Sequence, residues 1–126
     1  MSREFDIVMF GATGFTGQLV AEYIKGKKPA RWAIAGRNKA KLEALGLDAP
    51  IIVVDAHDRA GLDAVAKRTK VVCTTVGPYA KYGSELVAAC ANAGTHYCDL
   101  TGEVHWMRAM IDANHDRAVQ TGARIV

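Results

Sequence analysis

Short apolar runs rich in β-branched residues recur along the chain, and segments with a helical pattern of apolar and polar residues separate them. Several of the runs are continuous rather than alternating. Strands buried on both faces in a parallel sheet have this composition, because helices cover both sides of them. We therefore predict strands at Phe5–Phe10, Trp32–Ala35, Ile51–Val54, Val71–Thr75 and His96–Cys98, and a sixth strand, cut short, at Ala123–Val126.

The segments between these runs carry apolar residues at helical spacing. Asn38, Asp58 and Ser84 stand where side chains cap the N-termini of helices. The apolar residues that share one helix face are Phe15, Leu19, Val20 and Tyr23 in the first segment and Val104, Met107, Ile111 and Ala118 in the longest. The alternation of strand and helix predicts an α/β fold with a doubly wound parallel sheet, three αβα layers and right-handed crossovers.

A glycine-rich turn joins the first predicted strand to the first predicted helix. Its residues are Gly11, Ala12, Thr13, Gly14, Phe15, Thr16 and Gly17. Gly11 permits a sharp turn, Gly14 lets a pyrophosphate approach the backbone, and Gly17 lets the helix pack closely on the sheet. The helix N-terminus directs free N–H groups at the phosphates, and Thr13 and Thr16 add hydroxyl donors. The absence of a following Lys-Ser or Lys-Thr excludes a Walker A loop, and a tight turn without a ligand is the alternative.

The end of the second predicted strand indicates which dinucleotide binds. Domains that bind NAD usually carry an acidic residue there, but this chain has Gly36, Arg37 and Asn38. Gly36 leaves room for a 2′-phosphate, and the guanidinium of Arg37 can pair with it, which favours NADP over NAD. A solvated charge at the start of a helix is the alternative interpretation of Arg37.

The ends of the third and fourth predicted strands supply further candidates. Asp55, followed by Ala56, either accepts a hydrogen bond from the adenine amino group or serves as a turn residue. The loop after the fourth strand flanks the crevice, where its backbone would face the nicotinamide. The residues of this loop are Val76, Gly77, Pro78 and Tyr79. The Tyr79 ring either contacts the cofactor or is a partly exposed loop aromatic.

The sequence does not identify catalytic residues. A Tyr-x-x-x-Lys pair typical of short-chain reductases occurs only at Tyr23 and Lys27, in the wrong place at the end of the first helix. Either Asp99 or Glu103 touches the substrate or the ribose, or Thr101 and Glu103 cap the helix that follows. We favour the structural interpretation.

Length and composition limit the function further. The 126 residues suit one domain, and 50% of them are hydrophobic. A dehydrogenase with separate cofactor and substrate domains does not fit in this length. We therefore expect residues 1–126 to be an NAD(P)-binding Rossmann domain truncated from the N-terminal part of a longer two-domain enzyme.

Charge and cysteine content exclude several classes of partner. The net charge of +3, from 16 basic and 13 acidic residues, does not predict nucleic-acid binding. Cys73, Cys90 and Cys98 are an odd number at wide spacing, which predicts free thiols in a reducing, cytoplasmic compartment. Potential metal ligands are not clustered, so we predict no metal site. No uncharged stretch is long and apolar enough to predict a transmembrane segment.

Four segments together resemble the N-terminal region of the saccharopine dehydrogenase-like oxidoreductases, a family that includes trans-acting enoyl reductases of bacterial lipid synthesis. They are Gly11–Gly17, Ala35–Arg37, Val76–Tyr79 and Tyr97–Glu103. The resemblance implies a Rossmann cofactor domain followed by a larger catalytic and oligomerisation domain. It also implies a small-molecule or lipid-derived substrate, with hydride transfer from or to NADP(H), and a homodimer of the full-length protein.

Two other functions remain open. One is a non-catalytic NADP sensor similar to NmrA-type regulators, which share the glycine turn and need no catalytic pair. The other is a fragment of an extended short-chain reductase whose Tyr-x-x-x-Lys pair lies beyond residue 126.

Overall fold

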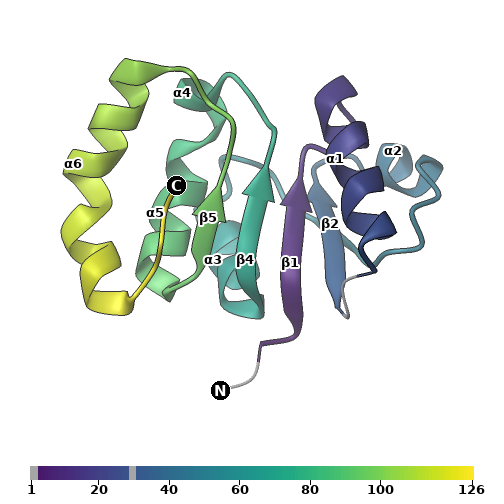
Figure 1. Ribbon diagram of the computed structural model, residues 1–126, viewed down its shortest axis with the longest axis horizontal. Coiled ribbons are helices and arrows are strands. Elements are labelled where there is room, and N and C mark those ends of the chain that lie inside the picture. Colours follow the sequence, from purple (N-terminus) through teal and green to yellow (C-terminus); the bar gives the residue numbers. More distant parts are fainter. Residues whose placement is uncertain (1–2, 29–30) are drawn as a thin grey trace.

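Five parallel strands form one sheet with helices on both faces (Figure 1). The computed structural model describes residues 3–28 and 31–126. The strands are β1 (Phe5–Phe10), β2 (Trp32–Gly36), β3 (Ile51–Val53), β4 (Thr69–Thr74) and β5 (His96–Cys98). The helices are α1 (Phe15–Gly26), α2 (Lys39–Ala44), α3 (Arg59–Arg68), α4 (Tyr79–Tyr82), α5 (Ser84–Ala93) and α6 (Val104–Thr121). The predicted α/β fold with a doubly wound parallel sheet is confirmed.

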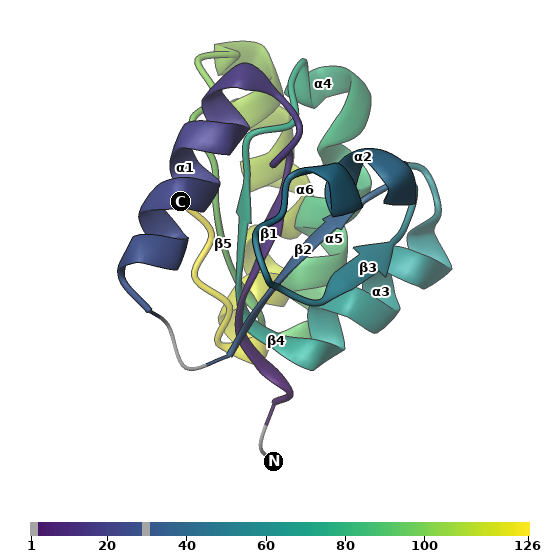
Figure 2. The same cartoon turned by 90° about the vertical axis from the view of Figure 1, so that its right-hand side faces the viewer.

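The strand order is β3-β2-β1-β4-β5, so the chain builds outwards from β1 on one side and from β4 on the other. Figure 2 shows α1 on one face of the sheet and α3 and α5 on the opposite face. The connection after β1 leads to one side of the sheet, and the later strands β4 and β5 lie on the other side. A crevice therefore opens at the carboxyl ends of β1 and β4. Open parallel sheets bind their ligands in this crevice.

Side chains of the central strand β1 alternate between two cores. Val8 is fully buried with Val72 of β4 and Leu62 of α3 in the larger core. Met9, also fully buried, packs on the opposite face against the layer that includes Leu42 of α2. Burial of β1 on both faces explains why its sequence is continuously apolar after Asp6.

Of the four residues on the predicted apolar face of α1, Val20 packs against the second core, whereas the other three point away from the sheet. Phe15, Leu19 and Tyr23 are 86%, 58% and 65% exposed. The buried residues of α1 are the small ones, Gly17 and Ala21. Small side chains occupy the closest contacts because the first turn of α1 passes very close to the preceding glycine turn, and Val20 and Ile24 pack beside them.

The longest helix, α6, differs from its predicted pattern in the same way. Trp106 and Ala118 are its buried residues, whereas Val104, Met107 and Ile111 are exposed. Spacing alone therefore placed only Ala118 correctly in the core. In the part of the chain that the structure describes, none of the helices combines the length and apolarity needed to cross a membrane.

The predicted helix caps and the sixth strand have mixed outcomes. Asn38 and Asp58 cap α2 and α3 through their side chains, as predicted. Ser84 is the first residue of α5 and does not cap it; its hydroxyl accepts a hydrogen bond from the Trp106 indole instead. At the predicted sixth strand, the described residues form one isolated parallel bridge, from Ile125 to the β5 residue Tyr97.

The guanidinium of Arg3 joins several elements at the amino-terminal edge of the sheet. Its four hydrogen bonds run to the carbonyl oxygens of Ala66 (2.6 Å), Thr69 (3.0 Å) and Ala93 (2.7 Å) and to Oγ1 of Thr95 (2.8 Å). One side chain thus connects the ends of α3 and α5 to the start of β4.

Candidate functional site

A cavity of about 320 Å³ lies at the carboxyl ends of the strands. Eight residues predicted to bind a dinucleotide line it, namely Gly11, Thr13, Gly36, Arg37, Asn38, Asp55, Ala56 and Val76. They come from the loops that follow β1, β2, β3 and β4. The fold therefore brings four separate sequence segments to one crevice, at the edge of the sheet where the topology places a ligand.

The other predicted residues lie outside this lining. Residues 14–17 form the N-cap and first turn of α1, and residues 77–79 lead into α4. The remaining lining residues were not among the predicted ones, and they are Phe10, Ala12, Ala35, Lys41, Leu42, Val54, His57 and Tyr82.

The three glycines of the turn meet different structural requirements. Gly11 has φ +94°, and a Cβ there would collide with the hydroxyl of Thr75. A Cβ at Gly17 would collide with the carbonyl oxygen of Gly11. At Gly14 the backbone is extended, and the nearest atom to a Cβ would be 3.6 Å away. The fold requires Gly11 and Gly17, whereas the missing side chain of Gly14 leaves open space in front of the turn.

Thr75 fastens the end of β4 to the glycine turn. Its backbone N–H donates to the carbonyl oxygen of Phe10 at 3.1 Å, and its hydroxyl donates to that of Gly11 at 3.3 Å. The two loops on either side of the crevice are thus held together by direct contacts. No local motif around Thr75 predicts this role.

The amino end of α1 is suited to bind an anion. Its N-cap is Gly14, which has no side chain that could cap the helix, and its first turn contains no acidic residue. The first amides of a helix lack intrahelical acceptors and carry partial positive charge. The exposed residues Thr13 and Thr16 flank these amides. A phosphate group fits this combination of donors.

The end of β2 presents positive charge to the cavity. Arg37 is exposed, and within residues 3–28 and 31–126 it has no hydrogen-bond or ion-pair partner. Lys41, in α2, lines the cavity beside it. Asn38 uses its side chain to cap α2 at 3.1 Å. A pair of cations next to Gly36, which has no side chain, can bind an anionic group on a ribose.

Asp55 lines the cavity and also forms a turn. Its Oδ1 accepts the backbone N–H of His57 at 2.8 Å, as expected for the structural alternative. The side chain is exposed, so its second carboxylate oxygen remains open to a ligand.

Tyr79 differs from both sequence interpretations of its side chain. The residue is 4% exposed, its hydroxyl donates to the carbonyl oxygen of Thr74, and its ring stacks on Trp106. The ring lies in the core beneath the loop, so it is not presented to a ligand in the crevice. Gly77 and Pro78, joined by a cis peptide bond, are the exposed part of the loop.

The polar residues after β5 make structural hydrogen bonds, but they do not form the side-chain cap of α6 that the sequence predicted. Asp99 accepts hydrogen bonds from the Tyr97 hydroxyl at 2.6 Å and from the Thr101 amide at 3.0 Å. Glu103 does not use its carboxylate to cap α6; that side chain turns instead to the start of α4. Backbone N–H groups of Ala80 and then Tyr79 donate to it and lower the pKa of this carboxyl.

Comparison with known proteins identifies the family of the chain. The sequence pattern of the family described as saccharopine dehydrogenase NADP binding domain matches residues 7–126. The chain belongs to this family. The resemblance stated from the sequence motifs is thereby confirmed, and so is NADP as the cofactor.

Relatives of this NADP-binding domain are much longer than the chain itself. Proteins named trans-acting enoyl reductase from Mycobacterium leprae and Mycobacterium tuberculosis are 52% and 50% identical to it over 132 residues. Both alignments cover 98% of this chain and 32% of the relative, so the chain spans about a third of their length. The solved apo structure of saccharopine dehydrogenase (L-Glu forming) from Saccharomyces cerevisiae shares the fold, with TM-score 0.74 and 18% identity, over 96% of this chain and 26% of that one.

The residues of this NADP-binding domain fit the cofactor. A Cβ at Gly14 would stand in the open space before the amino end of α1, where a pyrophosphate can approach the backbone. Arg37 and Lys41 offer positive charge, and the end of β2 has no carboxylate to repel a 2′-phosphate.

Two free cysteines of the domain lie opposite each other on neighbouring strands. Cys73 of β4 and Cys98 of β5 are opposed in register, and both are half-buried. A hydrogen bond from the Cys73 thiol lowers the pKa of Cys98 to about 7, and burial raises the pKa of Cys90 to about 12.

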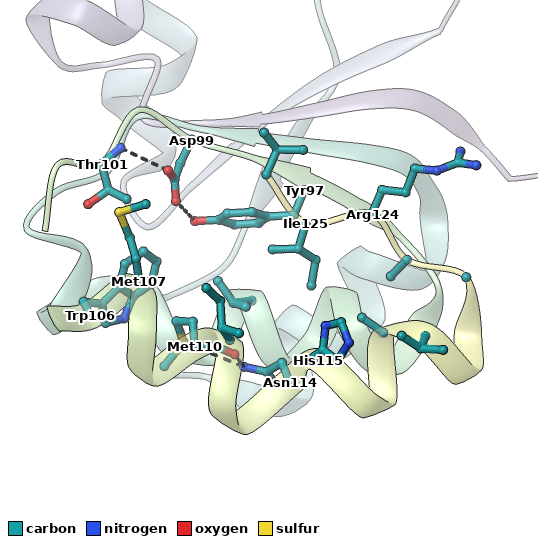
Figure 3. Close-up of a pocket in the computed structure, with 17 residues that line it drawn as sticks. Tyr97, Asp99, Thr101, Trp106, Met107, Met110, Asn114, His115, Arg124 and Ile125 are labelled. Atoms are coloured by element: carbon teal, nitrogen blue, oxygen red, sulfur yellow. Dashed lines mark hydrogen bonds between the residues drawn. The ribbon is translucent and has the colours of Figure 1, made fainter. Parts of the chain in front are cut away.

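A larger cavity of about 590 Å³ lies between α6 and the segment that pairs with β5 (Figure 3). Met107 and Met110 of α6, together with Tyr97 and Ile125, give it mainly apolar walls. It contains none of the residues predicted to bind NADP. Charged and glycine-rich features suited to phosphate groups line the smaller cavity, which is therefore the candidate cofactor site.

Proposed function

We propose that this chain is the cofactor-binding part of an NADP-dependent oxidoreductase that transfers hydride between NADP(H) and a lipid-derived enoyl substrate. The family of the domain and the names of its mycobacterial relatives support this proposal. The chain spans about a third of those relatives. We infer that residues outside this chain bind the substrate.

Each part of NADP has a proposed contact in the site. The pyrophosphate lies against Gly14 and the amino end of α1, the 2′-phosphate against Arg37 and Lys41, and the adenine near Asp55. The nicotinamide lies near the exposed loop of Gly77 and Pro78, at the carboxyl end of β4. When bound, NADPH supplies the hydride; this chain holds the cofactor and orients its two ends.

The observation that carries the proposal is the exposed, unpaired guanidinium of Arg37 next to Gly36, among the described residues. A charged group already engaged in an ion pair would have to give up that partner to bind a phosphate. Arg37 has no such partner to lose, and its planar donors match the oxygens of a phosphate group.

Calorimetric titration with NADPH and NADH tests this role. We expect the protein to bind NADPH more tightly than NADH, and Arg37→Ala to weaken NADPH binding roughly tenfold or more while NADH binding changes little. Arg108→Ala is the matched control, because Arg108 pairs with Asp112 on the exposed face of α6. Equal affinities of the wild-type protein for the two cofactors would contradict the proposal.

A turnover assay separates the enzyme from the sensor alternative. The full-length protein should oxidise NADPH in the presence of an enoyl thioester. Tight NADPH binding without oxidation across a panel of enoyl substrates would favour the sensor. A homodimer and a cytoplasmic location stay predictions.

A further inference from the structure

A carboxylate that follows β5 holds the loop that follows β4. Oε2 of Glu103 accepts the N–H of Tyr79 at 2.6 Å, and Oε1 accepts the N–H of Ala80 at 3.0 Å. These amides open α4, and its N-cap, Pro78, makes no side-chain hydrogen bond. Glu103 thus supplies from a distant segment the cap that α4 lacks locally.

The ring of Tyr79 is held by α6 as well. It stacks on Trp106 with the ring centroids 5.5 Å apart, and its hydroxyl donates to the carbonyl oxygen of Thr74 at 3.2 Å. Trp106 lies one turn beyond Glu103 and is held by a 2.9 Å hydrogen bond from its indole to Ser84. Both the backbone and the side chain of Tyr79 therefore depend on the start of α6.

Glu103 is itself held by residues that follow β5. The Tyr97 hydroxyl and the Thr101 amide both donate to Asp99, as the dashed lines in Figure 3 show. The hydroxyl of Thr101 accepts the backbone N–H of Glu103 at 3.0 Å. This series of hydrogen bonds sets the position of the carboxylate before any cofactor binds.

The loop of residues 75–78 is consequently anchored at two ends. Thr75 is fastened to Gly11 at one end, and Tyr79 is fastened to Glu103 at the other. Between these anchors, Val76 lines the candidate cofactor cavity, and Gly77 and Pro78 are exposed.

We infer that Glu103 is a positioning residue for the nicotinamide half of the cofactor site. This inference rests on the proposed function, in which the loop of residues 75–78 faces the nicotinamide. Without the carboxylate, the amides that open α4 lose their acceptor and the loop loses one anchor. Arg37 and Gly14, which hold the 2′-phosphate and the pyrophosphate, are not attached to Glu103. A Glu103 substitution should therefore weaken the binding of the nicotinamide half of the cofactor and leave the binding of the adenosine half nearly unchanged.

Titration of Glu103→Gln with two ligands tests this division. Glutamine keeps the length of the side chain but offers one acceptor oxygen in place of two. We expect NADPH affinity to fall roughly tenfold, and the affinity for adenosine 2′,5′-bisphosphate, which lacks the nicotinamide half, to stay within about twofold. The fluorescence of bound NADPH, which reports the surroundings of the nicotinamide, should move towards that of the free cofactor.

The control is Glu85→Gln, which alters a carboxylate that pairs with Arg59 and does not touch the loop. Both affinities of this variant should match those of the wild-type protein. If Glu103→Gln does not fold, Thr101→Val is the alternative, because it removes the hydroxyl that holds the Glu103 backbone. This variant should also bind NADPH more weakly and adenosine 2′,5′-bisphosphate unchanged, with a smaller loss of NADPH affinity.

The outcomes separate the two proposals. An equal loss of affinity for both ligands, or no loss for either, would overturn the positioning role of Glu103 alone. If the wild-type protein fails to bind adenosine 2′,5′-bisphosphate, the proposed cofactor site itself is wrong, and the positioning role falls with it.

Discussion

The carbonyl oxygen of Gly11 occupies the place that a Cβ on Gly17 would take. Gly17→Ala therefore forces α1 away from the sheet, and we expect it to destabilise the fold by about 1–3 kcal/mol or more. Thermal unfolding followed by circular dichroism should show a melting temperature lower by several degrees.

In contrast, Gly14→Val has room in the structure and should melt within a degree or two of the wild-type protein, while its NADPH affinity falls at least tenfold. The reverse assignment, a stable Gly17→Ala protein and an unfolded Gly14→Val protein, would refute this account of the turn.

Lys41 lines the cavity beside Arg37 and adds positive charge to the proposed 2′-phosphate site, which we did not predict from the sequence. Lys41→Ala should weaken NADPH binding roughly two- to fivefold, the range typical of an exposed charge pair, and the loss should shrink at high salt. Lys39→Ala is the matched control, because Lys39 is also exposed on α2 but lies outside the cavity lining. The measurement is calorimetry at two salt concentrations. Equal losses in the two variants would mean that only the overall charge of α2 matters.

Cys98 should be the most reactive of the three thiols at neutral pH. Its pKa of about 7 makes a large fraction thiolate, which is the form that alkylating reagents attack. Mass spectrometry after brief treatment with iodoacetamide should show Cys98 modified with a midpoint near pH 7, and the buried Cys90 protected until the protein unfolds. Cys73→Ala removes the hydrogen bond that stabilises the thiolate, so the midpoint should rise. A midpoint that does not move in Cys73→Ala would show that another group lowers the pKa.

Arg3 should contribute more to stability than a typical surface arginine. Arg3→Ala removes four hydrogen bonds from a charged donor, which we expect to cost about 2–4 kcal/mol of the free energy of unfolding. Arg108→Ala, which breaks an exposed ion pair with Asp112, should cost about 1 kcal/mol or less. Urea denaturation of both variants measures the difference. Similar midpoints would mean that the Arg3 contacts add nothing beyond those of a surface pair.

The elements of the fold and most of the crevice were predictable because they depend on local pattern. Short β-prone runs, several of them continuously apolar, predicted all five strands, and the end of each strand in a parallel sheet determines which residues reach the crevice. Gly11, Gly36, Arg37 and Asp55 follow directly from this rule, and the structure places them in one cavity.

The orientation of side chains was less predictable because it depends on contacts between distant segments. The stripe of Phe15, Leu19 and Tyr23 has the spacing of a packed helix face, but the close approach at Gly17 turns the opposite face to the sheet. The local sequence around Tyr79 gives no indication that its ring stacks on Trp106. The contact of Glu103 with α4 likewise links segments that come together only after the sheet has formed.

The place of β1 in the sheet has a consequence for synthesis of the protein in the cell. β1 is synthesised before the other four strands, but it is the central strand, and one of its two neighbours, β4, is made only after β2 and β3. Until then the nascent chain exposes one unpaired apolar edge of β1, which can pair with other chains. Chaperones that bind extended apolar segments should therefore engage this polypeptide early and release it once β4 has been translated.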